Sequence, residues 1–286
     1  MQHYYLEPHT ALAVPGEKGE MTLHFSTQLP TTVQAGLAAA LAVPMSRIIV
    51  KCRRAGGAFG GKERFFVALM AAVAAQRLQR PARLVLTREV DNNTTGHRHE
   101  TKAEYEVVHD DKGKILSTKF MFDVNAGMSL SNSDVWVSTL AKRVDGGYTL
   151  SKFEASGSAF KTNLTSNTAF RGFGSPEGAL IIEDVIEKIA LNLNIDPALV
   201  REQNLTKVGD FLHHGTKPVN EDFLIRCWNE CLEQSNYFKV RKDIETFNAV
   251  NKYKKRGIAI VPMKFFPTIA VNFLNQVIIL NERSKY

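Results

Sequence analysis

The pattern of hydrophobic and polar positions predicts a chain that mixes strands and helices. Apolar residues alternate along residues 3–28, which predicts two strands joined by a turn at 15–19. Further strands are predicted at 47–53, 82–87, 102–109, 115–124 and 153–160, with a hairpin turn at 110–114. Helical periodicity predicts helices at 32–41, 64–79, 176–193 and 197–205, and a less regular helical piece at 133–143.

This order of elements predicts an α+β fold, with mixed sheets and packed helices. Residues 209–220 are rich in Gly, His and Pro, which is typical of a boundary between domains. We therefore expect a first domain at 1–208 and the start of a second at 209–286. The second begins with helices at 221–235 and 237–252 and a strand at 257–263, and we expect it to be incomplete.

A glycine loop lies between the strand at 47–53 and the helix at 64–79. Its glycines are Gly56, Gly57, Gly60 and Gly61. Glycines let backbone approach a ligand closely, and amides at a helix start favour an anion. A P-loop would have Ser or Thr after Lys62, where this chain has Glu63, and no register gives the dinucleotide fingerprint. A tight turn with Glu63 as a helix-start charge is the simpler interpretation.

A second glycine loop precedes the helix at 176–193. Residues 168–176 read TAFRGFGSP, with Ser175 expected as N-cap and Pro176 at the first helical position. Phe59 in the first loop and Phe173 in the second offer flat apolar faces, and Arg171 adds a positive charge for an anion or a carbonyl oxygen. Two such loops predict two walls of one site.

These motifs resemble the molybdenum-cofactor subunit of the xanthine dehydrogenase and aldehyde oxidase family. The resemblance rests on GGAFGGKE at 56–63, SNTAFRGFG at 166–174, HYYLE at 3–7 and STQ at 26–28, and it extends to about Gln276. It implies a molybdopterin-binding domain that is C-terminally incomplete, since the family continues into a further sheet after Val277. It also implies oxidative hydroxylation of purines, other N-heterocycles or aldehydes, as in purine catabolism. Electrons would pass to 2Fe-2S centres and FAD in other domains.

The resemblance assigns roles to individual residues. Gln28 matches the glutamine that hydrogen-bonds an oxo ligand of molybdenum. The cofactor-binding residues are Gln28, Phe59, Gly60, Gly61 and Arg171, with backbone amides at Phe59, Gly60 and Arg171 facing the cofactor. The substrate-binding residues are Glu63, Phe173 and Arg171. No catalytic residue is expected in this chain, because the base lies beyond Gln276, and no protein ligand to the metal is expected, because the pterin holds it.

Three positions depart from the purine-oxidising pattern. An arginine is replaced by Thr139, although Lys142 and Arg143 are near in sequence. A clamping aromatic is replaced by Ile269, and the hydroxyl beside it by Ala270. Aldehyde oxidases lose the arginine too, but they also lose the glutamate kept here as Glu63. The substrate therefore stays open between a heterocycle and an aldehyde.

Composition excludes several other classes of protein. The net charge is +7, and the basic run 252–256 is short, so a solvated face is favoured over nucleic-acid binding. Cys227 and Cys231 lack zinc spacing and are expected to be buried thiols, and His97 and His99 are expected in a polar loop. No apolar run is long enough for a membrane span, which predicts a cytoplasmic protein, with a peroxisomal one left open. The resemblance implies a homodimer with a small-molecule substrate.

Three hypotheses follow. The first is an oxidoreductase segment that is inactive alone and active within a complete subunit. The second is a non-catalytic truncated scaffold or dimerisation module derived from the same family. The third is a phosphate-ligand domain in its own right, and it rests on residues 56–62 alone.

Overall fold

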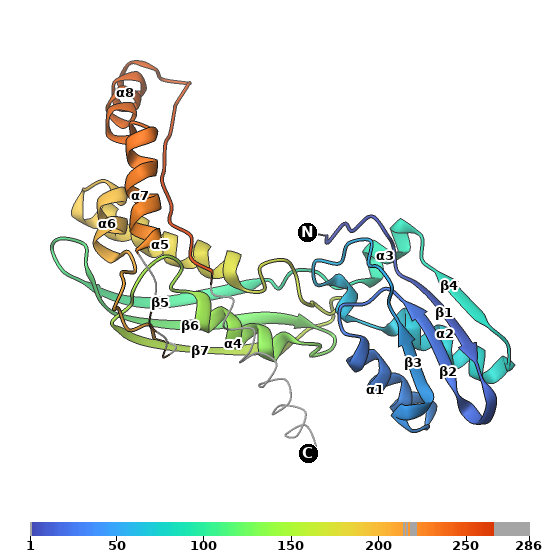
Figure 1. The fold of residues 1–286 in the computed structure, drawn as a ribbon. Helices are drawn as coiled ribbons and strands as arrows, with labels where there is room; N and C mark the ends of the chain where they lie inside the picture. Colours follow the sequence, from blue (N-terminus) through green and yellow to red (C-terminus); the bar gives the residue numbers. More distant parts are fainter. Residues whose placement is uncertain (1, 214, 216, 218–221, 266–286) are drawn as a thin grey trace. The chain divides into compact units, whose positions relative to one another are not determined.

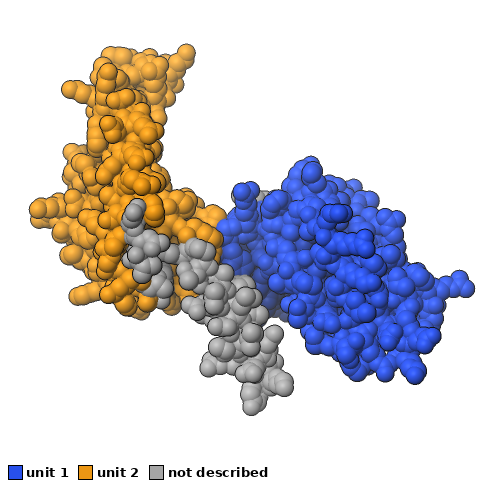
Figure 2. Space-filling model, in the orientation of Figure 1, with its two compact units in different colours: residues 1–100, 124–134, 159–173 blue, residues 101–123, 135–158, 174–286 orange. Residues whose placement is uncertain are grey.

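The computed structural model describes residues 2–213, 215, 217 and 222–265 of the 286-residue chain. These residues form two compact units. Unit 1 comprises residues 1–100, 124–134 and 159–173, and unit 2 comprises residues 101–123, 135–158 and 174–286 (Figure 2). The predicted domain boundary at 208/209 rests on sequence composition, whereas these units are defined by contacts between residues. The boundary stays a prediction.

Unit 1 is built on a four-stranded sheet in the order β3-β2-β1-β4 (Figure 1). Its strands are β1 (Thr10–Pro15), β2 (Met21–Phe25), β3 (Ile48–Lys51) and β4 (Ala82–Val85). Strand β1 pairs antiparallel with β2 and β4, whereas β2 and β3 are parallel. The parallel pair is possible because helix α1 (Pro30–Leu41) connects β2 to β3.

Alternate side chains of this sheet form a core with α1 and helix α2 (Phe66–Leu78). Ala11, Ala13 and Leu23 are 0% exposed on the strands, which follows from the period of two in their sequences. Helix α2 adds Val67 and four alanines, and such small side chains let its backbone lie close to the sheet. The core fixes the end of β3, from which the first glycine loop starts.

Helix α3 (Arg88–Thr94) was not predicted from the sequence. Its residues REVDNNT include poor helix formers and lack an apolar stripe. The helix is held by tertiary contacts of Asp91 and by Thr87 at its N-cap, whose hydroxyl accepts from Val90 N at 3.3 Å. A pattern of hydrophobic positions cannot reveal a helix whose inward side chain is a carboxylate.

Unit 2 contains most of a three-stranded sheet in the order β5-β6-β7. The strands are β5 (Thr101–His109), β6 (Ile115–Gly127) and β7 (Lys152–Lys161), and the ends of β6 and β7 belong to unit 1. Its helices are α4 (Ser133–Arg143), α5 (Ser175–Leu193), α6 (Pro197–Asn204), α7 (Phe223–Gln234) and α8 (Tyr237–Val250). Three short 3-10 helices, η1 (Glu17–Gly19), η2 (Met45–Arg47) and η3 (Gly61–Glu63), lie in unit 1. Mixed sheets with packed helices confirm the predicted α+β fold.

Three expectations of the sequence were wrong. Residues 257–263 are not a strand: Ile258 O accepts from Arg241 at 3.4 Å, and Arg256 O accepts from Asn248 at 2.9 Å, so side chains of α8 bond this backbone. Ser175 is not the N-cap of α5, since that position is taken by Gly174.

The third concerns Cys227 and Cys231, which are exposed rather than buried, because the buried side of α7 is occupied by Trp228. Among the described residues, no helix is long and apolar enough to span a membrane.

Candidate functional site

The two glycine loops are in direct contact within unit 1. A Cβ atom on Gly60 would lie 2.3 Å from the backbone oxygen of Ala169 and 2.9 Å from the backbone nitrogen of Phe170. Residues 56–61 follow β3, and residues 166–173 follow β7, so two strands that are far apart in sequence deliver the loops to one place. A side chain at position 60 would force them apart.

Both loops contain the same unusual backbone turn. Phe59 has φ of 54° and is followed by Gly60 at 98°, and Phe173 has φ of 42° and is followed by Gly174 at 87°. A bulky residue with positive φ stores strain of about 1 kcal/mol or more, which persists only where the surroundings demand it. In both loops a helical segment starts directly after this turn, at Gly61 and Ser175.

The N-terminal segment ties the loops together through His3. Its Nε2 lies 2.7 Å from Ala169 O, and its ring centroid lies 4.3 Å from that of Phe170. A Cβ on Gly61 would approach the same ring within 3.0 Å. Burial lowers the pKa of His3, which the hydrogen bond to Ala169 only partly offsets, so the neutral ring donates from Nε2. His3 belongs to the HYYLE motif at 3–7 that carries the family resemblance, but the resemblance assigns no role to it.

Gln28 is placed directly against the first loop. Its side-chain Oε1 accepts from Gly60 N at 2.9 Å, and its own backbone N–H donates to Lys62 O at 3.0 Å. Because Oε1 faces an N–H donor, the amide orientation is fixed, and Nε2 keeps its two donors for another partner. The resemblance expected the Gly60 amide to face a cofactor, but in this structure that amide is bonded to Gln28.

Lys62 is fully buried, and its side chain is bonded to the N-terminal segment. Its Nζ lies 2.5 Å from Glu7 Oε2 and 3.2 Å from Ser26 Oγ, and 5.0 Å from the centre of the Tyr5 ring. The same oxygen of Glu7 accepts from Gly56 N at 2.8 Å. Lys62 therefore anchors the loop to the N-terminal segment, and the phosphate-ligand hypothesis loses the lysine on which it depended.

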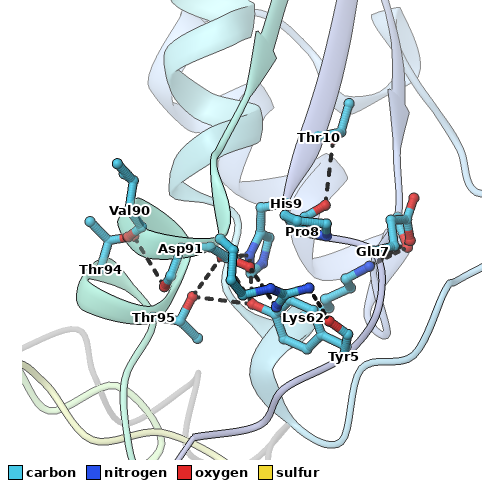
Figure 3. Close-up of polar contacts among 12 residues, drawn as sticks. Tyr5, Glu7, Pro8, His9, Thr10, Lys62, Val90, Asp91, Thr94 and Thr95 are labelled. Atoms are coloured by element: carbon cyan, nitrogen blue, oxygen red, sulfur yellow. Dashed lines mark hydrogen bonds and ion pairs between the residues drawn. The ribbon is translucent and has the colours of Figure 1, made fainter.

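A buried polar cluster supports this segment (Figure 3). The Tyr5 hydroxyl donates to Asp91 Oδ1 at 3.0 Å, and His9 Nδ1 lies 2.7 Å from the same oxygen. Burial acts to raise the pKa of Asp91, but hydrogen bonds from His9, Tyr5 and Thr95 outweigh it and lower the pKa. A Cβ on Gly61 would lie 2.7 Å from the Tyr5 ring. Tyr5 therefore connects the cluster to the backbone of the first loop.

Glu63 has the most perturbed carboxyl group of the site. Burial raises its pKa to about 7, although the hydrogen bond from Asn132 acts in the opposite direction. Asn132 Nδ2 donates to Glu63 Oε2 at 3.0 Å. At neutral pH the group is therefore divided between a carboxylate, which accepts hydrogen bonds, and a carboxylic acid, which can also donate one.

The second loop presents Arg171 and Phe173. Arg171 is exposed, and its backbone oxygen accepts from Arg98 at 2.6 Å. Arg98 also lies over the Phe170 ring at 4.3 Å, so this ring contacts both Arg98 and His3. Phe173 is half-buried, and Phe59 in the first loop is 46% exposed.

Other predicted positions have local partners or lie outside the described residues. The buried Thr139 hydroxyl donates to Val135 O at 2.8 Å within α4, and Arg143 contacts Ser175 Oγ at 3.2 Å and the Phe265 ring at 4.7 Å. Ile269, Ala270 and Gln276 lie outside the described residues. The part of the chain that the structure describes holds no cluster of three metal-ligating side chains, and His99 is bonded to Ser133 at 2.8 Å in a loop.

Asn132 was missed in the sequence, and no local signal marks it. It lies 69 residues from Glu63, in the connection between β6 and α4, and it belongs to no motif. The tertiary structure alone brings its amide to the carboxyl group.

Comparison with known proteins gives a consistent result. The family model described as "Molybdopterin cofactor-binding domain" matches residues 1–205. The chain is 40% identical over 278 residues to aldehyde oxidase 4 of Mus musculus, and 42% identical over 278 residues to xanthine dehydrogenase/oxidase of Gallus gallus. Both alignments cover 96% of this chain, but they cover 21% and 20% of those relatives. The chain therefore spans about a fifth of their length.

A solved structure shares the fold. The aldehyde oxidoreductase from Desulfovibrio gigas superposes with a TM-score of 0.78 at 22% identity, covering 88% of this chain and 27% of that one. At 22% identity this match shows a similar fold and indicates nothing about function. The identities to the curated relatives are higher, and those relatives carry both of the enzyme names that the sequence motifs suggested.

Proposed function

Because this chain belongs to the molybdopterin cofactor-binding domain family, we propose that it forms the cofactor-facing and substrate-facing part of a molybdenum hydroxylase. Its relatives are named xanthine dehydrogenases and aldehyde oxidases. The proposed reaction is oxidative hydroxylation of an N-heterocycle, such as a purine, or of an aldehyde. When bound, the molybdenum cofactor supplies the two-electron chemistry, and 2Fe-2S centres and FAD in other domains accept the electrons.

The observation that carries this proposal is the orientation of Gln28. Gly60 N–H holds Oε1, and the exposed side chain keeps the two N–H donors of Nε2. Such donors suit an oxo group or another anionic oxygen of a cofactor. Gly60 in turn is packed on Ala169 of the second loop, so the fit depends on both loops at once. The donor set is consistent with the group that the family binds.

Substrate recognition is assigned to Glu63, Phe173 and Arg171. A half-ionised Glu63 can bond a ring N–H or a carbonyl oxygen, and the Phe173 ring offers a flat apolar surface. Thr139, whose buried hydroxyl donates to Val135 O within α4, supplies no cation at the position where the family's purine-oxidising members have an arginine. We therefore keep both an aldehyde and a heterocycle as substrate classes.

Several further features are proposed from the resemblance. They are a homodimeric assembly, a cytoplasmic location and a place in purine catabolism. We also propose that no nucleic acid or membrane is a partner, and that the catalytic base comes from sequence beyond Gln276.

The proposal is tested by Gln28→Ala in the complete protein that carries this chain. We expect the molybdenum content and the activity on hypoxanthine or benzaldehyde to fall together by at least about tenfold, since the loss of a side chain that hydrogen-bonds the ligands of a metal centre typically has this effect. Gln203→Ala on the exposed face of α6 is the matched control. Wild-type protein without molybdenum or activity, or Gln28→Ala protein with both intact, would contradict the proposal.

A further inference from the structure

The amide of Asn132 is the feature of the site that the proposed function does not yet use. It occupies the last position before Ser133, where α4 begins, and it donates to Glu63 Oε2 at 3.0 Å. Its own Oδ1 is buried and has no hydrogen-bond partner among the described residues. A buried acceptor without a partner is destabilising, so the placement of this amide needs a compensating gain.

The orientation of the amide follows from the charge of Glu63. A carboxylate can only accept hydrogen bonds, so an ionised Glu63 requires Nδ2 on its side and leaves Oδ1 on the other. A protonated Glu63 could instead donate to Oδ1. The arrangement in the structure is the one that favours the ionised carboxyl group.

The charged neighbours of Glu63 in the chain are directed elsewhere. Lys62 is bonded to Glu7, and Arg64 is bonded to Ser131 at 3.3 Å and Ser129 at 3.4 Å. Burial raises the pKa of Glu63, and the opposing influence is the hydrogen bond from Asn132. The neutral amide of Asn132 therefore lowers the pKa of Glu63, as a cation does in an ion pair with a carboxylate.

We propose that Asn132 is a positioning residue for substrate recognition: it holds one oxygen of Glu63, favours the ionised form of this carboxyl group, and so leaves the second oxygen as an acceptor for a ring N–H. This inference rests on the proposed function in one respect, the role of Glu63 toward substrate. It assigns the site to heterocycles that carry an N–H donor. Without Asn132 the neutral acid would select instead for a ligand that accepts a hydrogen bond.

The first test uses the chain itself and needs no cofactor. The titration of Glu63 is followed by carbon-detected NMR in protein labelled at glutamate side chains, in the wild type and in the Asn132→Leu variant. We expect the pKa to rise from about 7 to about 8, because a hydrogen bond to a charged group is worth roughly one such step. Ser131→Ala is the matched control, since it removes a neighbouring hydroxyl that bonds Arg64.

A second measurement covers the case in which Asn132→Leu fails to fold. In the wild-type chain the side-chain amide protons of Asn132 should titrate with the same midpoint as Glu63. An unchanged Glu63 pKa in Asn132→Leu, or amide protons of Asn132 that do not follow Glu63, would overturn the inference.

The consequence for substrate is measured in the complete protein. At pH 7 half of Glu63 is ionised at a pKa of about 7, against roughly a tenth at about 8, so kcat/KM for hypoxanthine should fall about fivefold in Asn132→Leu and recover by pH 9. An equal loss at every pH would indicate a merely structural role and contradict the inference. A wild type inactive on both substrate classes would contradict the proposed function instead, while the NMR result would still decide the coupling of the two side chains.

Discussion

Single residues of this site take their properties from partners far along the chain. Gln28 owes its orientation to Gly60, and Glu63 owes its raised pKa to burial, which the hydrogen bond from Asn132 opposes. The strained φ values of Phe59 and Phe173 show the same dependence, because neither residue would choose this conformation by itself. At this scale function depends on contacts rather than on residue type.

Gly60→Ala should destabilise the chain by about 2–4 kcal/mol. The new Cβ would meet Ala169 O at 2.3 Å, and φ of 98° is unfavourable for alanine. The free energy of unfolding from urea titration measures the effect. Gly257→Ala is the control, since no described atom lies within 4 Å of its Cβ position. Equal stability of the two variants would show that the loops are not in contact.

Glu63 should make stability depend on pH. The unfolded chain loses this proton near the ordinary pKa of 4.5, whereas the folded chain holds it up to about 7. The stabilisation is therefore complete below pH 4.5 and is lost as the pH rises through 7. After discounting for partial exposure, it amounts to about 2 kcal/mol at most.

The measurement compares wild type and Glu63→Gln. Their difference in unfolding free energy should shift in favour of Glu63→Gln by about 1–2 kcal/mol between pH 5 and pH 8. Glu202→Gln, at an exposed position of α6, is the control, and its difference from wild type in unfolding free energy should not change between pH 5 and pH 8. A constant difference for Glu63→Gln would mean that the carboxyl group keeps an ordinary pKa.

At the scale of elements, capping side chains join parts of the chain that are distant in sequence. Asp196 accepts from Ala198 N at 2.8 Å as the N-cap of α6, and it also accepts from the Tyr237 hydroxyl at 3.2 Å. Its second oxygen lies 3.1 Å from Arg241 of α8. One carboxylate therefore starts one helix and holds another.

Asp196→Ala should lower the stability of α6 and α8 together. Loss of an N-cap costs about 1 kcal/mol, and loss of the two contacts to α8 adds to this. Hydrogen exchange should become faster in both helices. In the control Asp243→Ala, on the exposed face of α8, neither helix should change. Faster exchange in α6 alone would show that Asp196 acts as a cap and nothing more.

At the scale of the whole molecule, the chain corresponds to about a fifth of the relatives that it matches. We have proposed that the catalytic base comes from sequence beyond Gln276. We therefore expect the purified 286-residue chain to hold no molybdenum cofactor and to show no turnover on hypoxanthine or benzaldehyde. Metal analysis that finds close to one molybdenum atom per chain would contradict this expectation.

The sequence by itself determined the elements with strong periodicity and the residues of the two glycine loops. Strands β1 to β7 and helices α1, α2 and α5 follow from alternating or helical apolar positions, because burial of one face depends on local spacing. The sequence could not reveal α3, because the buried residue of this helix is Asp91. It also could not show that residues 257–263 do not form a strand, because side chains of α8 bond the backbone there.

Only the tertiary structure decided how the site residues meet. The contact of Gly60 with Ala169 joins positions 109 apart in number, and the Glu63–Asn132 hydrogen bond spans 69. The turning of Lys62 toward Glu7 is likewise invisible in the motif that contains it. Such pairings depend on where strands deliver their loops and on what is buried there, and neither quantity is encoded in local spacing.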